Sequence, residues 1–448
     1  MTAQSVATPG HERPPVVIVG AGFAGLACAK ALGAAGVPAT LIDRQNYHLF
    51  VPLLYQVATA ALSPADIAQP IRRILRRYPS VEVLLGEVQA VDAQRREVVL
   101  DGGQRLAYSR LVLATGSVCN YFGNDQWAPH ARCPRDLADA AEIRARILGA
   151  LEEAERSRDL AQREALMTFV VVGGGATGVE MAGAIAELVR HALRKEFRTI
   201  DPAQARIVLV EAGARLLTAF PEELADYARG RLEALGIEIR TGKPVEVLDS
   251  EGVVIGGERI GARTVVWGAG TRAAPAARWL GLAEGGRLPV APDLSVPGQD
   301  DVYALGDVAA FPDHDGRPLP ALAQVAKQQG EHLGRGLARL HRDGAPLAPF
   351  HFRNRGNTAI VGRNAAIFDF GGGRTLRGRP AWFLWALVHI YLLNGLERRF
   401  LVATQWLVRY VTRQRGARLI TGRKPPAEPS RSPAAPSRHE PVPASVEP

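Results

Sequence analysis

A glycine-rich turn near the start of the chain has the residue types and spacing that bind the phosphates of a dinucleotide. An apolar, β-branched run, Val16–Val19, leads directly into Gly20, Gly22 and Gly25, and an alanine-rich stretch follows. In such a turn the first glycine permits a tight bend, the second lets the backbone approach a pyrophosphate, and the third lets the helix pack close to the strand. The N-terminus of that helix then presents unpaired N–H groups to the phosphates. The pattern predicts a βαβ unit with a nucleotide site.

A carboxylate stands at the end of the next expected strand, about where such a site needs one. Leu41 and Ile42 lead into Asp43. A carboxylate at this point of a βαβ unit accepts a hydrogen bond from a ribose 2′-hydroxyl. Because strand, glycine turn, helix and acid follow one another in the right order, the stretch indicates a nucleotide site more strongly than three glycines alone.

The same arrangement occurs a second time. Thr168–Val172 is another apolar run, Gly173, Gly175 and Gly178 follow it, and the next expected strand again closes on an acid, Glu211. Two such units predict two bound nucleotides, a pattern typical of a flavin reductase with FAD in the first unit and a pyridine nucleotide in the second. The plainer alternative, a glycine turn that only joins a strand to a helix, would have to arise twice.

Each unit is expected to close on a short strand that runs into small residues, at 111–116 and at 265–270. The chain then returns to the first unit. The stretch 301–307 predicts a strand that ends in Gly-Asp, and the carboxylate of Asp307 can hold a hydroxyl or a water beside a phosphate. A helix is expected to follow from Ala321 to about Leu340, with proline in its first turn.

The segments that connect these elements are less regular. Val81–Leu85, Val88–Val91 and Glu97–Leu100 are expected to form a three-stranded β-meander. The stretch 44–57 mixes aromatic residues, prolines and amides without a steady period, so two interpretations stay open: a loop that crosses a bound ligand, or a buried connector. Residues 135–163 are highly charged and predict helix.

The positive charge of the chain is concentrated in one segment. The 448 residues carry a net charge of +9, with 47% hydrophobic and 22% charged residues, as in an ordinary globular protein of two or three domains. Between residues 371 and 420 there are nine arginines and one acid, Glu397, which gives +8. The rest of the chain is therefore nearly neutral, and the basic surface belongs to the C-terminal region.

Cysteine usage points away from disulfide and metal chemistry. Cys28, Cys119 and Cys133 form no Cys-x-x-Cys motif, and no set of side chains has metal-ligand spacing. We therefore expect a reducing compartment, no redox cysteine pair and no metal. Residues 1–13 lack a signal-peptide pattern, so export is not expected.

The C-terminal region alternates apolar and basic residues. Ala381–Leu393 is almost wholly apolar but is shorter than the ~20 residues that span a bilayer. In the next stretch a helix would carry one polar stripe, and its members are Arg398, Gln405, Arg409, Thr412 and Arg413. Phe400, Leu401, Trp406 and their apolar neighbours would cover the remaining surface, which is typical of a helix lying in a membrane interface.

Two other interpretations of this region stay open: a dimer interface, or helices buried against the body. A nucleic-acid surface is not expected, because the patch is too apolar to follow phosphates. Arg423–Pro448 is rich in proline, serine and alanine and predicts a disordered tail.

Over residues 16–422 the chain resembles the type II NADH dehydrogenases, the single-chain, non-pumping NADH:quinone oxidoreductases within the superfamily of pyridine nucleotide-disulfide oxidoreductase-like flavoproteins. Besides the first glycine turn, the matching motifs are Asn46–Ala58, Gly173–Glu180, Leu305–Ala309, Ala323–Gln328, and Ala381–Trp385 with His389 and Ile390. The resemblance implies an α/β fold with two Rossmann-type domains, for FAD and NADH, and a C-terminal membrane-associating helical region. The implied boundaries are 15–120 and 284–350 for the two parts of the FAD domain, 165–283 for the NADH domain, 351–422 for the C-terminal strands and amphipathic helices, and 423–448 for the tail.

The resemblance also implies which residues contact each nucleotide. Non-covalent FAD would contact Gly20, Gly22, Phe23, Ala24, Gly25, Leu26, Asp43, Arg44, Val88, Thr115, Gly116, Asp307, Ala323, Gln324 and Arg377. NADH would contact Gly173, Gly175, Ala176, Thr177, Gly178, Glu211, Gly268 and Gly270. An acid at Glu211 disfavours a 2′-phosphate and so favours NADH over NADPH.

Three polar side chains are implied in the chemistry: Glu180, close to the flavin and nicotinamide, and Gln324 and Gln328 on one helix face. The same two amides, with Tyr55 and Gln56, would border the quinone. Many family members have a lysine near the C-terminal motif, whereas this chain has Arg377. Because arginine keeps its proton, a proton relay at that position is not expected.

The implied activity is transfer of hydride from NADH to FAD followed by reduction of a membrane quinone, without proton pumping. We expect a homodimer held peripherally on the cytoplasmic side of the cell inner membrane, attached to anionic lipid by its C-terminal helices. The alternative is a soluble NAD(P)H-dependent flavoprotein reductase that passes electrons to a protein such as a ferredoxin.

Overall fold

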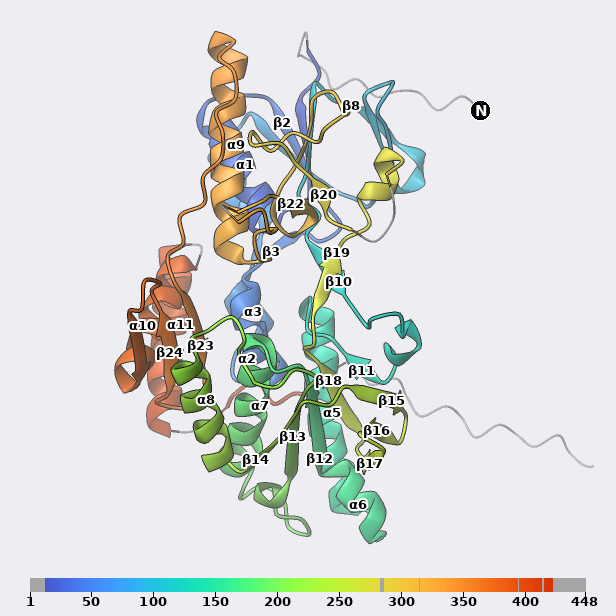
Figure 1. Cartoon of the computed structure of the whole chain (residues 1–448), viewed down its shortest axis with the longest axis vertical. Helices are drawn as coiled ribbons and strands as arrows, with labels where there is room; N and C mark the ends of the chain where they lie inside the picture. Colours follow the sequence, from blue (N-terminus) through green and yellow to red (C-terminus); the bar gives the residue numbers. More distant parts are fainter. Residues whose placement is uncertain (1–12, 283–285, 314, 394, 413–414, 422–448) are drawn as a thin grey trace, which may run out of the picture.

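Two five-stranded parallel sheets organise the chain, one in each half of the molecule (Figure 1). The structure is a computed structural model, and it describes residues 13–282, 286–313, 315–393, 395–412 and 415–421. The first sheet has the order β21-β9-β1-β2-β5 and the second has the order β11-β18-β12-β13-β14. This is the α/β fold with two Rossmann-type units that the two glycine turns predict. The tail expected over 423–448 lies outside the described residues.

The first sheet collects strands from both ends of the first unit and from the returning chain. Its members are β1 (Val16–Val19), β2 (Ala39–Asp43), β5 (Val81–Leu85), β9 (Arg110–Leu113) and β21 (Val302–Ala304). All neighbours are parallel. β1 is buried along its whole length, as a strand with both faces covered is, which explains why it is an unbroken apolar run.

Two helices pack side by side against this sheet: α1 (Phe23–Ala34) and α9 (Ala323–Asp343) (Figure 1). Their close approach needs glycine. A Cβ at Gly330 would stand 2.1 Å from the carbonyl oxygen of Ala24, and one at Gly334 would stand 2.7 Å from that of Cys28. The helix predicted from Ala321 is therefore present, and small residues bind it to the helix of the first glycine turn.

The expected β-meander is wrong in its first strand. Val81–Leu85 is β5, the outer parallel strand of the first sheet, where it pairs with β2. The antiparallel meander is instead formed by β6 (Val88–Asp92), β7 (Glu97–Leu100) and β8 (Arg105–Ala107). The alternating pattern of a half-buried strand is the same in both kinds of sheet, so the pattern alone does not tell them apart.

The second unit repeats the first. Its parallel strands are β11 (Ala131–Arg132), β12 (Thr168–Val172), β13 (Arg206–Glu211), β14 (Ile237–Thr241) and β18 (Thr264–Trp267). Its helices are α5 (Leu137–Arg156), α6 (Leu160–Leu166), α7 (Ala176–Glu187) and α8 (Glu222–Ala234), and its small antiparallel sheet is β15 (Val245–Asp249), β16 (Gly252–Ile255) and β17 (Glu258–Gly261).

A narrow two-stranded crossing joins the units. β10 (Ser117–Cys119) and β19 (Thr271–Ala273) run antiparallel between the two halves (Figure 1). The remaining short elements connect or edge the two sheets. They are β20 (Leu288–Pro289), β22 (Ala309–Ala310), the 3₁₀ turns η2 (Asp101–Gly103), η3 (Asp125–Trp127), η5 (Pro202–Gln204), η6 (Ala277–Leu280) and η7 (Gly306–Val308), and the π-turn η4 (Leu188–Ala192).

The irregular stretch after Asp43 folds into a series of short elements. They are β3 (Tyr47–Leu49), η1 (Val51–Leu53), α2 (Leu54–Ala58), α3 (Pro64–Ile67), β4 (Ala68–Pro70) and α4 (Ile71–Leu75). Every residue of α2 is buried, and the helix packs against α5 and α7 of the second unit. The stretch is therefore buried and carries the first unit onto the second, and residues within 51–56 also line cavities, so the two interpretations are compatible.

The C-terminal region packs beside the second unit (Figure 1). It consists of β23 (Asn357–Ile360), β24 (Ala366–Asp369), β25 (Thr375–Gly378), α10 (Arg379–Leu392) and α11 (Leu396–Thr412). Its buried apolar side chains, among them Trp385 and Val402, join the core of the second unit. None of the described helices is long and apolar enough to cross a membrane.

The side of α11 that packs on the body carries both apolar and polar side chains, among them the fully buried Val402. Gln405 donates to the carboxylate of Asp66, 3.1 Å away, and the indole N–H of Trp406 also points inward. The exposed side instead carries Phe400, Leu407 and neighbouring apolar residues. The body therefore covers only part of the apolar surface of the helix, and the rest is exposed.

We predict that Gly25→Ala prevents flavin binding. A Cβ at this position would stand 1.8 Å from the carbonyl oxygen of Gly20, so α1 must move away from the turn at a cost of about 3 kcal/mol or more in the free energy of unfolding. The flavin content of the purified variant checks this. Gly230→Ala in α8 is the matched control, because its Cβ meets none of the described atoms within 4 Å and alanine favours a helix by up to about 1 kcal/mol. Full flavin content in Gly25→Ala would contradict the prediction.

Candidate functional site

The first glycine turn forms an open cradle between β1 and α1. Gly20 has a φ of +102°, a conformation that favours glycine. Where a Cβ of Gly22 would point, the described residues place no atom within 4 Å, so the backbone is open there. Leu26 lies buried in the helix that follows. The turn therefore exposes the N-terminal N–H groups of α1 to whatever lies in front of it.

Asp43 stabilises this turn from the end of β2. One carboxylate oxygen accepts from the backbone N–H of Ala21 at 2.6 Å and the other accepts from that of Gln45 at 2.7 Å. Burial raises its pKa, while these two hydrogen bonds act in the opposite direction. His48 contacts the carbonyl oxygen of Ala21 through Nδ1 at 2.9 Å, and burial lowers its pKa to about 4, so its ring is neutral.

A cavity of about 430 Å³ opens in front of the cradle. Its lining from the first unit combines small residues, among them Gly22, Ala24, Ala114, Gly116, Gly306 and Ala323, with larger ones such as Phe23, Leu54, Tyr55 and Asp307. The hydroxyl of Thr115 beside it is buried and has no hydrogen-bond partner among the residues that the structure describes. An open backbone, small walls and an unsatisfied hydroxyl fit a bulky cofactor with polar edges, as FAD is.

Asp307 is bound by Ser117, which is in turn bound by Arg135, and the sequence singled out neither of these two residues. Its carboxylate accepts from the hydroxyl of Ser117 at 2.6 Å, and Arg135 donates to the same hydroxyl at 2.7 Å. Arg135 also lines the cavity. Ser117 belongs to β10, Arg135 lies just before α5, and Asp307 lies in η7 after the returning strand. Because these positions are far apart in the sequence, no local pattern could have linked them.

Other residues expected at FAD lie farther from this cavity. Arg44 is exposed, and Val88 is buried at the start of β6, where it pairs with Leu100. Arg377 is exposed on β25, and its guanidinium lies over the ring of Tyr227 at 5.5 Å. Arg377 lines neither cavity, so its predicted place at the flavin is not supported by the structure.

The second glycine turn has the same construction. Gly173 has a φ of +110°, and a Cβ at Gly178 would stand 1.7 Å from the carbonyl oxygen of Gly173. Glu211 accepts from the backbone N–H of Gly174 at 2.5 Å and from that of Gly213 at 2.6 Å. Gly175 and Ala176 begin α7, as Gly22 and Phe23 begin α1. Each acid thus fixes its own turn.

The cavity extends from the first unit to the second. Its lining also includes Thr177, Glu180, Trp267, Gly268 and Gly270. The two turns therefore face one space, as an enzyme needs in order to bring two nucleotides together.

Glu180 stands where this cavity meets a second one. It lies in α7, and one of its carboxylate oxygens accepts from the backbone N–H of Ile360 at 3.3 Å. Burial raises its pKa to about 8, and the contact with Ile360 offsets this only in part. At neutral pH the carboxyl therefore holds a proton. A buried acid with a raised pKa at a cavity wall is suited to proton transfer.

The second cavity has a volume of about 530 Å³ and lies between α2, α7 and the C-terminal helices. Aromatic side chains form much of its wall: Tyr55, Trp382, Trp385, Trp406 and Tyr410. The ring of Trp385 stacks on that of Trp406, with centroids 5.2 Å apart. Glu187 and Arg415 form an ion pair at 3.1 Å in the same wall. Tyr55 and Glu180 line both cavities.

A chain of hydrogen bonds connects α11 to this shared wall. The indole N–H of Trp406 donates to the amide oxygen of Gln56 at 3.1 Å. The amide nitrogen of Gln56 donates to the hydroxyl of Tyr55 at 3.0 Å. Burial raises the pKa of Tyr55 well above its usual value, so the phenol stays protonated. Two of the four residues expected at the quinone are thus joined to one another and to a C-terminal helix.

The other two, Gln324 and Gln328, have a different place. The amide of Gln324 donates to the carbonyl oxygen of Gly356 at 3.1 Å and accepts from the N–H of Arg355 at 3.1 Å. Gln328 bonds both backbone groups of Arg353, at 3.0 and 3.1 Å. Neither amide is among the residues that line the two cavities described here. In the described residues their spacing along α9 serves to anchor the chain that leads to β23, and their place beside the quinone stays a prediction.

Comparisons with known proteins agree with this geometry. The family model described as pyridine nucleotide-disulphide oxidoreductase matches residues 14–330. The chain is 40% identical over 435 residues to the type II NADH:quinone oxidoreductase NdhA of Mycobacterium tuberculosis, which covers 93% of this chain and 90% of that one. It is 38% identical to the type II NADH:quinone oxidoreductase Ndh of the same organism, over 92% and 91% of the two chains. In fold it is similar to NDH2 of Plasmodium falciparum solved with NADH, with a TM-score of 0.83, 20% identity, and coverage of 92% and 100%.

The raised pKa of Glu180 predicts a specific pH dependence of stability. Its ordinary pKa is 4.5 and its folded pKa is about 8, so the folded state binds more protons between these values. The free energy of unfolding should fall as pH rises through this range, because ionisation of the buried carboxyl opposes folding. Glu180→Gln should lack this fall. Denaturant unfolding of both proteins from about pH 5 to about pH 9 measures it, and identical pH profiles would contradict a raised pKa.

Proposed function

We propose that this chain, which belongs to the pyridine nucleotide-disulphide oxidoreductase family and within it to the type II NADH:quinone oxidoreductases, has a definite site for its second substrate. That site, where the quinone is reduced, is the wall shared by the two cavities. FAD is the cofactor of the chain, and NADH and a quinone are its substrates. Bound FAD supplies two-electron chemistry between the nicotinamide and the quinone. The observation that carries the proposal is that Tyr55 and Glu180 line both cavities.

The residues of the first cavity bind and orient the two nucleotides. We assign FAD to the cradle of Gly20, Gly22 and Gly25, because its open backbone and small walls leave room for a large cofactor. NADH belongs at the second cradle, where Glu211 already holds the turn and would repel a 2′-phosphate. Two helix N-termini directed at one cavity favour the negative charge that both nucleotides bring.

The second cavity fits the head of a quinone. Its aromatic wall stacks on flat rings, and the hydroxyl of Tyr55 and the amide of Gln56 offer polar contacts to quinone oxygens. The net reaction of NADH with a quinone takes up one proton beyond the hydride. Glu180 holds a proton at neutral pH and faces this cavity, so we assign it as the donor. Gln324 and Gln328 then support the site indirectly, by anchoring the segment that leads to β23 and its Ile360.

The exposed apolar surface of the C-terminal helices suits a membrane. Phe400, Leu407 and Val411 lie on one side of α11 and are 77%, 65% and 73% exposed. The arginines of the same region would attract anionic headgroups, at about 1 kcal/mol for each one near the surface. We therefore propose a peripheral location on a membrane. The cytoplasmic side of the inner membrane follows from the substrates, because NADH is a charged cytoplasmic nucleotide and the quinone is lipid-soluble.

A second apolar face lies on α10. Phe383, Leu387 and Tyr391 follow one another at a spacing of four residues and are all strongly exposed. This spacing places them in one row along the helix. The row is separate from the exposed face of α11, and we propose it as the surface through which two copies form a homodimer.

We predict that Trp406→Phe weakens quinone use and leaves NADH use unchanged. The substitution removes the indole N–H that holds Gln56, and a hydrogen bond of this kind contributes about 0.5–1.5 kcal/mol. The KM for a short-chain quinone should rise about threefold to tenfold. Anaerobic reduction of the flavin by NADH should keep its rate, because Trp406 does not line the first cavity.

Trp279→Phe is the matched control for this experiment. Trp279 packs in the first unit, and its indole N–H has no hydrogen-bond partner among the residues that the structure describes. Replacement of Trp279 should change neither the KM for the quinone nor the rate of flavin reduction by NADH. An unchanged quinone KM in Trp406→Phe, or a slower flavin reduction, would place the quinone elsewhere.

We predict that Phe400→Ser weakens binding to vesicles of phosphatidylglycerol and phosphatidylcholine by about tenfold, since one buried aromatic side chain contributes about 1.5–3 kcal/mol. Leu160→Ser is a matched control, because Leu160 is 76% exposed and Phe400 is 77% exposed, but Leu160 lies on α6. Cosedimentation measures both variants. Equal vesicle binding by the Phe400→Ser and Leu160→Ser variants would contradict a contact between α11 and the membrane.

A further inference from the structure

Two of the three cysteines come together at the junction of the two units. Cys119 ends β10 and Cys133 directly follows β11. Both pack in the small apolar cluster that surrounds Trp267. The two thiols are separated by 14 positions in the sequence, so their spacing gave no sign of this proximity, and both are free thiols in the structure.

Trp267 explains why the two thiols meet. It ends β18, which pairs with β11 so that Val266 lies opposite Arg132, next to Cys133. Its indole N–H donates to the carbonyl oxygen of Asn120 at 2.8 Å, next to Cys119. One tryptophan therefore contacts the chain on both sides of the pair. Its position is set by the sheet of the second unit, so the meeting of the thiols is part of the fold.

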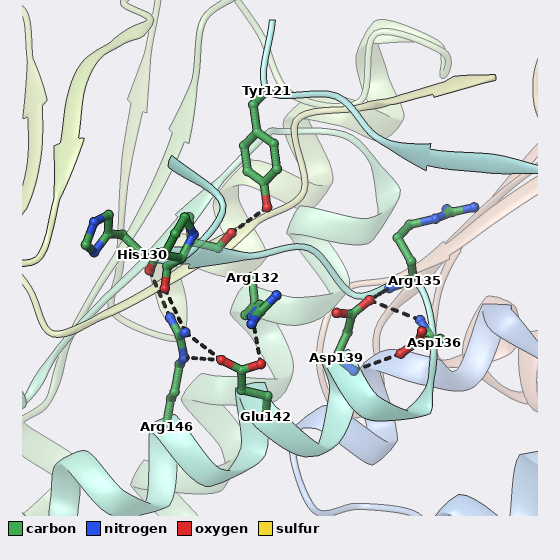
Figure 2. A network of polar contacts seen from close by, with 10 residues as sticks. Tyr121, His130, Arg132, Arg135, Asp136, Asp139, Glu142 and Arg146 are labelled. Atoms are coloured by element: carbon green, nitrogen blue, oxygen red, sulfur yellow. Dashed lines mark hydrogen bonds and ion pairs between the residues drawn. The ribbon is translucent and has the colours of Figure 1, made fainter. Parts of the chain in front are cut away.

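The loop between the cysteines is closed by further contacts near its ends. The hydroxyl of Tyr121 donates to the carbonyl oxygen of Ala131 at 2.7 Å, as Figure 2 shows. Glu142 of α5 binds the guanidinium groups of Arg132 at 2.7 Å and Arg146 at 2.5 Å (Figure 2). The two ends of the loop are thus held together and fixed to α5, without help from a covalent bond.

The same helix fixes the chain just after Cys133. Asp139 accepts from the backbone N–H of Arg135 at 3.1 Å, and Asp136 caps α5 through the N–H of Asp139 at 2.9 Å (Figure 2). The guanidinium of Arg135 reaches back to Ser117, two residues before Cys119. The guanidinium of Arg135 therefore lies close to Cys119. Asp139 holds the backbone of Arg135, and Ser117 holds its side chain.

The three cysteines differ in their surroundings. Cys28 is fully buried in α1, and burial raises its pKa to about 12, so it is inert. Cys119 is only half-buried, and contact with Cys133 together with the charge of Arg135 lowers its pKa. Cys133 lines the cavity that faces both glycine turns. The pair is thus reachable from solvent, and one member is suited to act as the attacking thiolate.

We propose that Cys119 and Cys133 are a reversible redox pair, in which a hydroperoxide oxidises Cys119 and Cys133 closes a disulfide across the neck of the 120–132 loop. The thiolate of Cys119 attacks the peroxide, the O–O bond breaks, and a sulfenic acid forms as the peroxide leaves as water or an alcohol. The thiol of Cys133 then displaces the hydroxyl group as water, and the S–S bond forms. In total the two thiols lose two electrons and two protons, and the peroxide takes up these electrons and protons. A dithiol reverses the step by thiol–disulfide exchange.

The pair lies at the edge of the cavity that we assign to the two nucleotides, because Cys133 lines that cavity. The disulfide would covalently link β10 of the crossing to the start of the segment that enters the second unit. The hydrogen bond from Tyr121 to Ala131 already holds the two ends of the loop together beside the thiols.

Treatment of the flavin-loaded enzyme with hydrogen peroxide tests the proposal. Free thiols are alkylated under denaturing conditions after the reaction, and peptides are mapped by mass spectrometry without reduction. We expect Cys119 and Cys133 to escape alkylation and to appear in one cross-linked peptide, while Cys28 remains alkylated. Treatment with dithiothreitol should restore all three thiols. Three alkylated cysteines after peroxide, or a sulfinic acid on Cys119 beside a free Cys133, would overturn the proposal.

Single variants separate the pair from general oxidation. Cys28→Ala should still form the cross-link, which makes it the matched control. In Cys133→Ala the reaction should stop at the sulfenic acid, which dimedone labels on Cys119. The flavin absorbance of each variant checks that it folds. Dimedone labelling of Cys119 that is no greater in Cys133→Ala than in the wild type would show that Cys133 does not resolve the sulfenic acid.

Discussion

The close contact between a strand end and the first turn of a helix, made twice, is the constraint on which the rest of this structure depends. At Gly25 and at Gly178 the helix lies so near the preceding turn that not even a methyl group fits. Each helix therefore begins at a fixed point in front of its strand and presents its N-terminal N–H groups in a fixed direction. Asp43 and Glu211 strengthen the arrangement by accepting backbone hydrogen bonds from the turns themselves. The two cradles share one cavity because the crossing of β10 and β19 orients one unit toward the other.

Electrostatics at the centre of the molecule follows from burial more than from nearby charges. Glu180, Tyr55 and His48 all have their pKa values moved toward the neutral form, and burial is the largest cause for each. A neutral wall suits a space that admits an uncharged quinone head from one side. The anionic nucleotides meet the positive ends of helices on the other side. The two kinds of ligand are thus received by surfaces of different character that meet at Glu180.

The sequence was sufficient to predict the features that repeat locally. Glycine spacing identified both cradles, apolar runs identified the parallel strands, and the motif around Asn46–Ala58 identified a segment that lines both cavities. It was insufficient where the partner of a residue lies far along the chain. The spacing of Gln324 and Gln328 is that of one helix face, whether their amides line a pocket or anchor another segment. Only the position of residues 353–356 shows what the amides bind. The same limit applies to the meeting of Cys119 with Cys133 and to the support of Asp307 by Ser117.

The hydrogen bonds that α11 makes with the body have a consequence for the proposed membrane contact. Trp406 and Gln405 connect this helix to Gln56 and Asp66, so the surface that we propose for lipid and the wall that we propose for the quinone are mechanically connected. On that proposal, a shift of the helix toward or away from a bilayer would change the position of the phenol of Tyr55, two hydrogen bonds away. Substrate delivery and membrane attachment would then not be independent properties. An enzyme released from its bilayer would be expected to lose the shape of its acceptor site before it loses its grip on the nucleotides.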